Sequence, residues 1–126
     1  MGLEAPAPAV PDAGTTLTKA CVRAAEFLGL SQQRLATVLG VSRPTVTRMA
    51  RGAVQLSPTQ PKSWELATLF VRLFRSLDAV VGHGEAGRAW LEGENTDLGA
   101  RPADLIVTAE GLVRVVHYLD AHRGRV

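Results

Sequence analysis

The stretch spanning residues 31–52, SQQRLATVLGVSRPTVTRMARG, constrains the local structure more strongly than any other part of the sequence. Its first half carries apolar residues at the spacing of one helix face, namely Leu35, Ala36 and Leu39. Gly40 follows where this helix would stop, because glycine readily adopts the left-handed backbone found at helix ends. The pattern predicts a short helix over residues 32–39 that ends in a tight turn.

A second helix is expected directly after that turn. Ser42 is a good N-cap, and Pro44 is tolerated in a first turn, where backbone N–H groups have no helical partner. Val46 and Met49 would be buried against the first helix, and the second helix would end at Gly52. The face opposite to these apolar residues carries Arg43, Thr45, Thr47 and Arg48.

The spacing of the small and apolar positions resembles the helix-turn-helix of the Xre/Cro-like repressors. Ala36 stands where the two helices would cross closely, Gly40 follows four residues later, and Val46 docks the second helix. The opening of the second helix, SRPTVTR, matches the same family. The resemblance implies binding to operator DNA. The alternative from the residues alone is a plain αα-hairpin within a helical bundle.

The resemblance also implies roles for the exposed residues. If the second helix enters the major groove, Arg43 and Arg48 are the expected guanine readers, because a guanidinium group fits O6 and N7 together. Thr45 and Thr47 share their face, and Gln32, at the start of the preceding helix, is a candidate for phosphate contact.

The charge distribution agrees with a DNA-binding unit in the N-terminal half. Residues 23–51 contain five arginines and one acid, whereas residues 52–100 contain four basic and six acidic residues. The basic excess therefore lies where neutralisation of phosphates would need it. Lys19 and Arg23, on the first helix of this unit, either contact phosphate or belong to an ordinary solvated face.

Composition favours a folded cytoplasmic protein. Hydrophobic residues make up 46% of the 126 residues, which argues against a disordered chain. The most apolar run, residues 64–81, is interrupted by four charged residues and should not span a membrane, and no signal peptide is expected. The single cysteine, Cys21, excludes an internal disulfide and fits a core position, the alternative being a reactive thiol.

The whole chain has helical periodicity, which predicts an all-α fold in three parts. Residues 1–14 are rich in alanine and proline and are interpreted as a flexible tail. Residues 15–60 would form the helix-turn-helix unit, with its first helix starting at Thr15 or Thr16. Residues 61–126 would form a helical C-terminal domain.

A long helix is predicted over residues 62–81, with a wide apolar stripe formed by Leu66, Leu69, Phe70, Leu73, Phe74 and Leu77. The small N-terminal unit can cover only part of this stripe, so the rest must pack against the C-terminal segments or a second copy of the chain. A single helix-turn-helix also reads only a half-site. We therefore expect at least a homodimer, with this helix near the interface.

The C-terminal half resembles the toxin-binding domain of Xre/MbcA/ParS-type antitoxins. The residues that carry the resemblance are Trp90, Leu91, Asn95, Pro102, Leu105, Thr108, Gly111, Val115 and Leu119. One position departs from the family pattern, because Leu98-Gly99 stands where L-x-G is usual. The two resemblances together cover residues 16–126.

Physical chemistry gives these residues structural interpretations as well. Trp90 is expected to be a core anchor, with contact to a partner as the alternative. Asn95 would bond to nearby backbone and set its loop, and Thr108 would cap the last helix. Gly111 near the start of that helix is explained by a close approach of another segment.

The resemblance implies a partner, a RES-domain toxin that consumes NAD or transfers a group from it. In that family the C-terminal end of the antitoxin enters the active-site cleft of the toxin. The matching residues here are His122, Arg123, Gly124, Arg125 and Val126. The alternative is a frayed, solvated terminus.

The sequence thus predicts an antitoxin of a type II toxin–antitoxin system, a homodimer within a larger complex, that neutralises its toxin and represses its own operon. The alternative is a stand-alone repressor whose C-terminal half only dimerises. We expect no enzyme, cofactor or metal site, because His83, His117 and His122 are scattered without metal-ligand spacing and no nucleophile has a plausible base.

Overall fold

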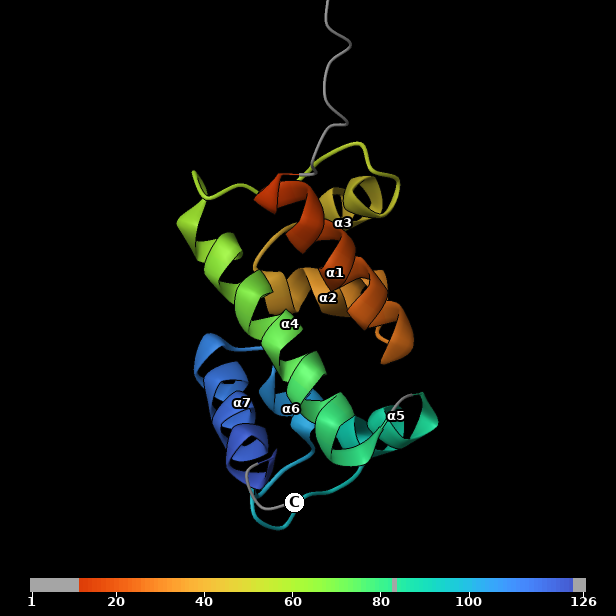
Figure 1. Cartoon of the computed structure of the whole chain (residues 1–126), viewed down its shortest axis with the longest axis vertical. Coiled ribbons are helices and arrows are strands. Elements are labelled where there is room, and N and C mark those ends of the chain that lie inside the picture. Colours follow the sequence, from red (N-terminus) through yellow and green to blue (C-terminus); the bar gives the residue numbers. More distant parts are fainter. Residues whose placement is uncertain (1–11, 83, 124–126) are drawn as a thin grey trace, which may run out of the picture.

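The computed structural model describes residues 12–82 and 84–123, which fold into α-helices (Figure 1). Within these residues there is no strand, only an isolated antiparallel bridge between Asn95 and Ala100, so the predicted all-α fold is confirmed. None of the described helices is both long and apolar enough to cross a membrane. In chain order the helices are α1 (Ala13–Phe27), α2 (Gln32–Leu39), α3 (Arg43–Ala50), α4 (Pro61–Val81), α5 (Glu85–Glu92), α6 (Pro102–Leu105) and α7 (Ala109–Arg123).

The long helix α4 runs through the centre of the molecule, and its bounds agree with the prediction to within one residue (Figure 1). Helices α1 and α2 pack on α4 towards its N-terminal end, and α3 packs on α1 and α2. Helices α5 and α7 pack on α4 towards its C-terminal end, and α6 packs on α5 and α7. The two groups of helices are therefore joined through one shared element.

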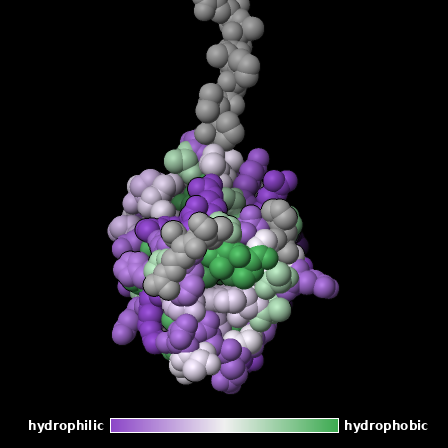
Figure 2. All heavy atoms as spheres, turned by 60° about the horizontal axis from the view of Figure 1, so that its bottom comes forward, coloured by the Kyte–Doolittle hydropathy of each residue, from purple (hydrophilic) through white to green (hydrophobic). Residues whose placement is uncertain are grey.

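The apolar stripe of α4 is covered within the single chain. Four of its residues, Leu66, Phe70, Leu73 and Leu77, are buried, and Leu69 and Phe74 are half-buried. The C-terminal helices supply the cover that the N-terminal unit lacks, so the width of the stripe does not require a second copy. Figure 2, which brings the end with α5, α6 and α7 forward, accordingly shows a mostly hydrophilic surface with one small hydrophobic area.

The first helix begins at Ala13, before the predicted starts at Thr15 and Thr16. The Asp12 carboxylate accepts a hydrogen bond of 2.7 Å from the Thr15 backbone N–H, so aspartate performs the capping role assigned to threonine. This hydrogen bond lowers the pKa of Asp12. Ala13 and Gly14, placed in the tail by the sequence analysis, are helical, whereas residues 1–11 lie outside the described part of the chain.

Buried Thr18 and Cys21 lie on the face of α1 that packs against the rest of the molecule. The Thr18 hydroxyl donates to the Gly14 carbonyl oxygen (2.6 Å) and accepts from the Leu56 backbone N–H (2.8 Å). Cys21 is fully buried, and its burial raises the pKa of the thiol to about 12. Cys21 is therefore a core residue that stays protonated near neutral pH, and the reactive-thiol alternative does not apply.

The helix-turn-helix forms as predicted. Gly40 has a left-handed backbone (φ +71°) at the end of α2, and the Ser42 hydroxyl accepts a hydrogen bond from the Thr45 backbone N–H (3.2 Å) at the start of α3. The second helix ends at Ala50, slightly before the expected Gly52, which instead adopts a positive φ in the following turn. The residues expected to hold the helices together are all buried: Ala36, Val46 and Met49.

The polar and small residues of the C-terminal half have the expected local roles. The Asn95 side-chain oxygen accepts from the Leu98 backbone N–H (3.0 Å), and Thr108 Oγ1 accepts from the Gly111 backbone N–H (3.0 Å). A Cβ atom on Gly111 would lie 1.8 Å from the carbonyl oxygen of Leu105. The close approach expected at Gly111 is thus confirmed.

The core anchor of α5 is Leu91, not Trp90 as predicted. Leu91 is fully buried, whereas Trp90 packs against the edge of the core and stays partly exposed. Leu91 and Gly87 lie on the buried face of α5, so Leu91 occupies the core position that was predicted for Trp90. At the position that departs from the family pattern, Leu98 is buried and Gly99 takes a left-handed turn (φ +76°).

Candidate functional site

The residues predicted to read DNA form one surface at the end of the molecule that contains α3 (Figure 1). Arg43 and Arg48 are exposed on α3, and Thr45 and Thr47 are half-buried between them. Gln32 is exposed as the first residue of α2. We refer to these five residues, Gln32, Arg43, Thr45, Thr47 and Arg48, as the reading surface.

Side-chain hydrogen bonds connect members of the reading surface. The Thr47 hydroxyl donates to Gln32 Oε1 (2.7 Å), which holds the start of α2 against the exposed face of α3. The hydroxyls of Ser42 and Thr45 lie 2.8 Å apart, and Arg48 Nη2 donates to Thr45 Oγ1 (3.4 Å). The structure therefore orders several of these side chains before any ligand is bound.

The local electrostatics of this surface favour an anion. Neither α2 nor α3 has an acidic residue in its first turn, so no side-chain charge offsets the partial positive charge of their N-termini. Arg43 begins α3 and Arg48 lies in its last turn. Exposed guanidinium groups and two uncompensated helix N-termini together suit the phosphate backbone of a nucleic acid.

Lys19 and Arg23 lie on a separate face. They are exposed on α1 and line an open groove bordered by α4 and the end of α3. Arg51 and Arg75 line the same groove, which also includes Phe27. The Phe27 ring is 50% exposed and stacks on Phe74 at 5.8 Å between ring centres.

Arg88 of α5 ties the C-terminal half to the end of α1. Its Nε donates to the Phe27 carbonyl oxygen (2.8 Å), and its Nη2 donates to the Glu26 carbonyl oxygen (3.2 Å). Carbonyl groups in the last turn of a helix lack the usual partner four residues later, so a guanidinium group placed there adds hydrogen bonds and complements the helix dipole. A residue of the C-terminal half thus caps a helix of the N-terminal half.

A second link between the halves is an ion-pair network around Arg34 of α2. Its guanidinium group contacts Glu92 (3.5 Å) at the end of α5 and Asp104 (3.1 Å) in α6. Arg101 contacts the same two carboxylates, at 3.7 and 3.0 Å. Arg34 comes two residues after Gln32, so the network holds α2, and with it one edge of the reading surface, against the C-terminal half.

Of the five C-terminal residues predicted to bind the toxin, the first two lie in α7 and the other three lie outside the described residues. His122 Nδ1 lies 2.8 Å from the Tyr118 carbonyl oxygen, and Arg123 Nη1 donates to Ser76 Oγ (3.2 Å) on α4. Arg123 is exposed but helical, because α7 continues through it, so the alternative of a frayed terminus does not describe this residue. Gly124, Arg125 and Val126 lie outside the described residues.

The last turns of α7 are also anchored by Asp120. The Ser76 hydroxyl donates to Asp120 Oδ1 (2.6 Å), and Arg72 forms an ion pair with the other carboxylate oxygen. The hydrogen bond from Ser76, reinforced by Arg72, lowers the pKa of Asp120. Asp120 is therefore ionised near neutral pH and binds α7 to α4 just before the chain's C-terminal residues.

A row of aromatic rings lies beside this end and was missed by sequence reasoning. Trp90 of α5 stacks on Tyr118 of α7 at 6.2 Å between ring centres, and Tyr118 lies 4.2 Å from the His122 ring. All three residues are partly exposed. We call Trp90, Tyr118 and His122 the aromatic row. The four-residue spacing of Tyr118 and His122 was a visible signal, but their contact with Trp90 depends on the fold.

The histidines do not form a metal site in the described part of the chain. His117 is exposed on α7, His122 packs on Tyr118, and His83 lies outside the described residues. Among the described residues, no group of three or more His, Cys, Asp or Glu side chains is placed to hold a metal ion.

Comparison with known families assigns both halves of the chain. The family model for the antitoxin Xre-like helix-turn-helix domain matches residues 8–72, which is more than half of the chain. The model for the antitoxin Xre/MbcA/ParS C-terminal toxin-binding domain matches residues 76–125. A search among curated proteins finds no match. The chain therefore belongs to the Xre-like antitoxins, with a DNA-binding helix-turn-helix domain followed by a toxin-binding domain.

Proposed function

We propose that this antitoxin acts in a type II toxin–antitoxin system, where it neutralises a RES-domain toxin and represses its own operon in the cytoplasm. The observation that supports the proposal is that the helix-turn-helix and the toxin-binding helices pack on the same long helix, α4. Helix α3, which carries four of the five reading-surface residues, lies at one end, and α5 and α7 of the toxin-binding domain lie at the other (Figure 1). One chain could therefore bind DNA and toxin at the same time.

Co-expression with the product of the neighbouring gene, which we propose to be a RES-domain protein, tests the partner. We expect a stable complex that survives affinity purification and gel filtration. A stand-alone repressor whose C-terminal half only dimerises would be recovered without the RES-domain protein, while still binding its operator. The two functions are thus separated by what elutes with the chain.

In the DNA complex, we propose that α3 enters the major groove with Arg43 and Arg48 on guanines and with Thr45 and Thr47 along the same groove. Gln32 would contact a phosphate. Its Oε1 already accepts a hydrogen bond from Thr47, so the two N–H donors of its amide can serve the phosphate. Arg48 is held by Thr45, so less conformational entropy is lost when it binds a base.

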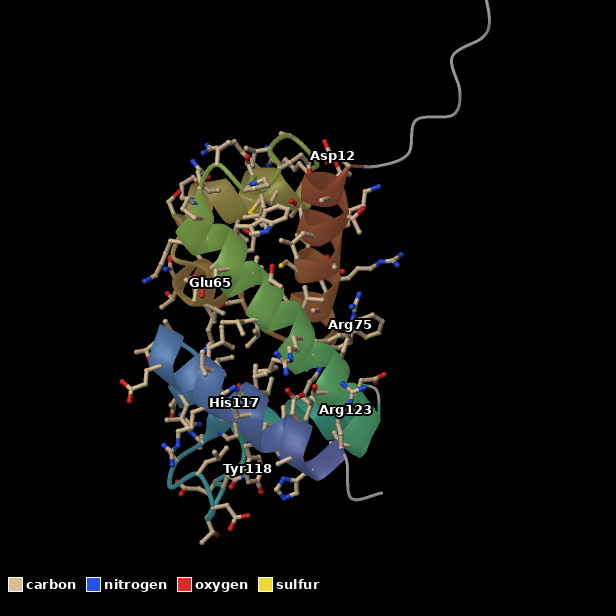
Figure 3. All side chains as sticks on the ribbon, turned by 60° about the vertical axis from the view of Figure 1, so that its left-hand side comes forward. Asp12, Glu65, Arg75, His117, Tyr118 and Arg123 are labelled. Atoms are coloured by element: carbon tan, nitrogen blue, oxygen red, sulfur yellow. The ribbon has the colours of Figure 1, made fainter. Side chains whose placement is uncertain are left out.

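Removing one guanidinium group at a time tests these contacts. Arg43→Ala and Arg48→Ala should each weaken operator binding by about 1–3 kcal/mol in a gel-shift titration, because each loses a bidentate base contact. Arg75→Ala on α4 is the matched control, because it removes an equal charge from an exposed residue that is not part of the reading surface (Figure 3). Operator affinity that is unchanged in both α3 variants would contradict the assignment.

We further propose that two copies bind a palindromic operator. The support is geometric, since one helix-turn-helix reads one half-site and a two-fold dimer supplies the second. Light scattering of the purified chain at micromolar concentration should give the mass of a dimer. A monomeric mass, both alone and with operator DNA, would exclude this arrangement.

For the toxin, we propose that the C-terminal end occupies its active-site cleft. Arg123 donates to Ser76 of α4, and Asp120 of α7 accepts from the same Ser76 hydroxyl, so residues 124–126 would extend from a fixed point and lose less entropy on insertion. Arg125 would donate charge-assisted hydrogen bonds to acidic groups in the cleft, and Gly124 would pass a narrow opening without a side-chain clash.

Deletion of residues 124–126 tests the insertion while keeping the anchoring contact of Arg123. We expect the shortened chain to lose neutralisation of a co-expressed toxin, measured by cell growth, while operator affinity stays unchanged. The unchanged operator affinity serves as the control for folding. If the shortened chain neutralises the toxin as well as the full chain does, inhibition comes from the helix surfaces instead.

A further inference from the structure

The aromatic row is built as a fixed surface. The Tyr118 hydroxyl donates to Asp97 Oδ2 (2.8 Å), and the His122 ring is bonded to the Tyr118 carbonyl oxygen (2.8 Å). Trp90 stacks on the Tyr118 ring, so each ring is held by another ring or by a hydrogen bond. Rings that are ordered before binding give contact area at a low cost in conformational entropy.

We infer that the aromatic row is the surface on which the body of the toxin docks, an inference that rests on the proposed function. Three observations place the toxin there. The row lies within residues 76–125, the part that matches a toxin-binding domain. Its last member, His122, directly precedes Arg123 and the residues proposed to enter the cleft. Tyr118 also lies at the opposite end of the molecule from α1's start at Asp12, so a bound toxin leaves α3 accessible (Figure 3).

The chemistry of the aromatic row indicates which type of toxin side chain contacts it. Trp and Tyr are enriched at the energetic centres of protein interfaces. Their ring faces attract cations, and the carboxylate of Asp97 lies at the edge of the Tyr118 ring. The end of the molecule with α5, α6 and α7 is mostly hydrophilic, with one small hydrophobic area (Figure 2), so a large apolar patch is not what this end offers. The toxin segment that covers the row therefore carries an arginine or lysine stacked on the rings and paired with Asp97.

Truncation of the Trp90 indole is the direct test. With a catalytically inactive RES-domain protein as the probe, Trp90→Ala should weaken binding about thirtyfold or more in calorimetry. Trp90→Phe keeps a ring at the position and should retain most of the affinity. Phe27→Ala is the matched control, because Phe27 is also an exposed aromatic residue in a stacked pair but lies on α1. It should bind the probe like the wild-type chain.

Two further variants make the inference independent of any folding defect in Trp90→Ala. His122→Ala, near the end of α7, should weaken binding about fivefold by removing the outer ring. Asp97→Asn should weaken binding at low salt and reduce its salt dependence, because it removes the charge that pairs with the cation. Circular dichroism and operator affinity of every variant report whether the fold is kept.

The outcomes are distinct. Wild-type affinity in both Trp90→Ala and His122→Ala would overturn the docking surface while leaving the RES-domain partner in place. Wild-type affinity and salt dependence in Asp97→Asn would contradict the inference that the toxin places an arginine or lysine on the aromatic row. Failure of the wild-type chain itself to bind the probe would overturn the proposed partner, and this inference with it.

Discussion

Two buried glycines show that the neighbours of a residue, not its type, decide what it contributes. Gly111 and Gly87 both lie in the first turn of a helix in the C-terminal half. A Cβ atom on Gly111 would lie 1.8 Å from a backbone oxygen, which belongs to Leu105. On Gly87 the nearest atom would be a side-chain methyl group of Leu28 at 3.4 Å, an ordinary contact. Only Gly111 is therefore required by the packing.

Gly111→Ala should consequently lower the free energy of unfolding by about 1–3 kcal/mol, because the backbone of α6 has to move away from the new methyl group. This loss exceeds the gain of up to about 1 kcal/mol that alanine brings to a helix. Gly87→Ala makes the same chemical change without the clash and should be neutral or stabilising. Urea denaturation of the two variants measures both effects. Equal stabilities would show that the approach of Leu105 to α7 is not a tight one.

At the scale of helices, the elements set by local chemistry were predictable. The end of α2 follows from Gly40 and the start of α3 follows from Ser42, because each of these residues acts on backbone groups within one turn. The start of α1 was placed too late because Asp12 and the threonines are all acceptable caps, and a hydrogen bond such as the one between Thr18 and Leu56, which adds support to the first turns of α1 from far along the chain, is not visible in the local pattern. Local pattern therefore gives the helices, and tertiary contacts set some of their ends.

The candidate site was predictable to the same extent. The residues of the reading surface were identified from one contiguous stretch, although the hydrogen bond between Gln32 and Thr47 joins two helices and was not foreseen. Trp90 was misplaced in the core because its neighbour Leu91 is equally apolar, and periodicity in a helix as short as α5 does not separate them. Its stacking on Tyr118 joins two helices that are distant in sequence, so only the fold reveals it.

At the scale of the whole molecule, the boundary between the two family matches falls inside one helix. The helix-turn-helix match ends at residue 72 and the toxin-binding match begins at residue 76, whereas α4 spans Pro61–Val81. The halves are further joined by Arg88 on the end of α1 and by the Arg34 network. Each half therefore takes part of its core from an element that belongs to both.

The last prediction follows from this shared helix, namely that the chain unfolds in one cooperative transition. The two tryptophans report on different halves, since Trp64 lies near the start of α4 and Trp90 lies in α5. In the single-tryptophan variants Trp90→Phe and Trp64→Phe, fluorescence and the helical circular dichroism signal should change at one denaturant concentration within each variant. If the fluorescence and circular dichroism midpoints coincide in both variants, the two halves unfold together, as expected when both depend on packing against α4. A fluorescence midpoint that departs from the circular dichroism midpoint in either variant would show instead that the halves unfold separately and that α4 does not couple them.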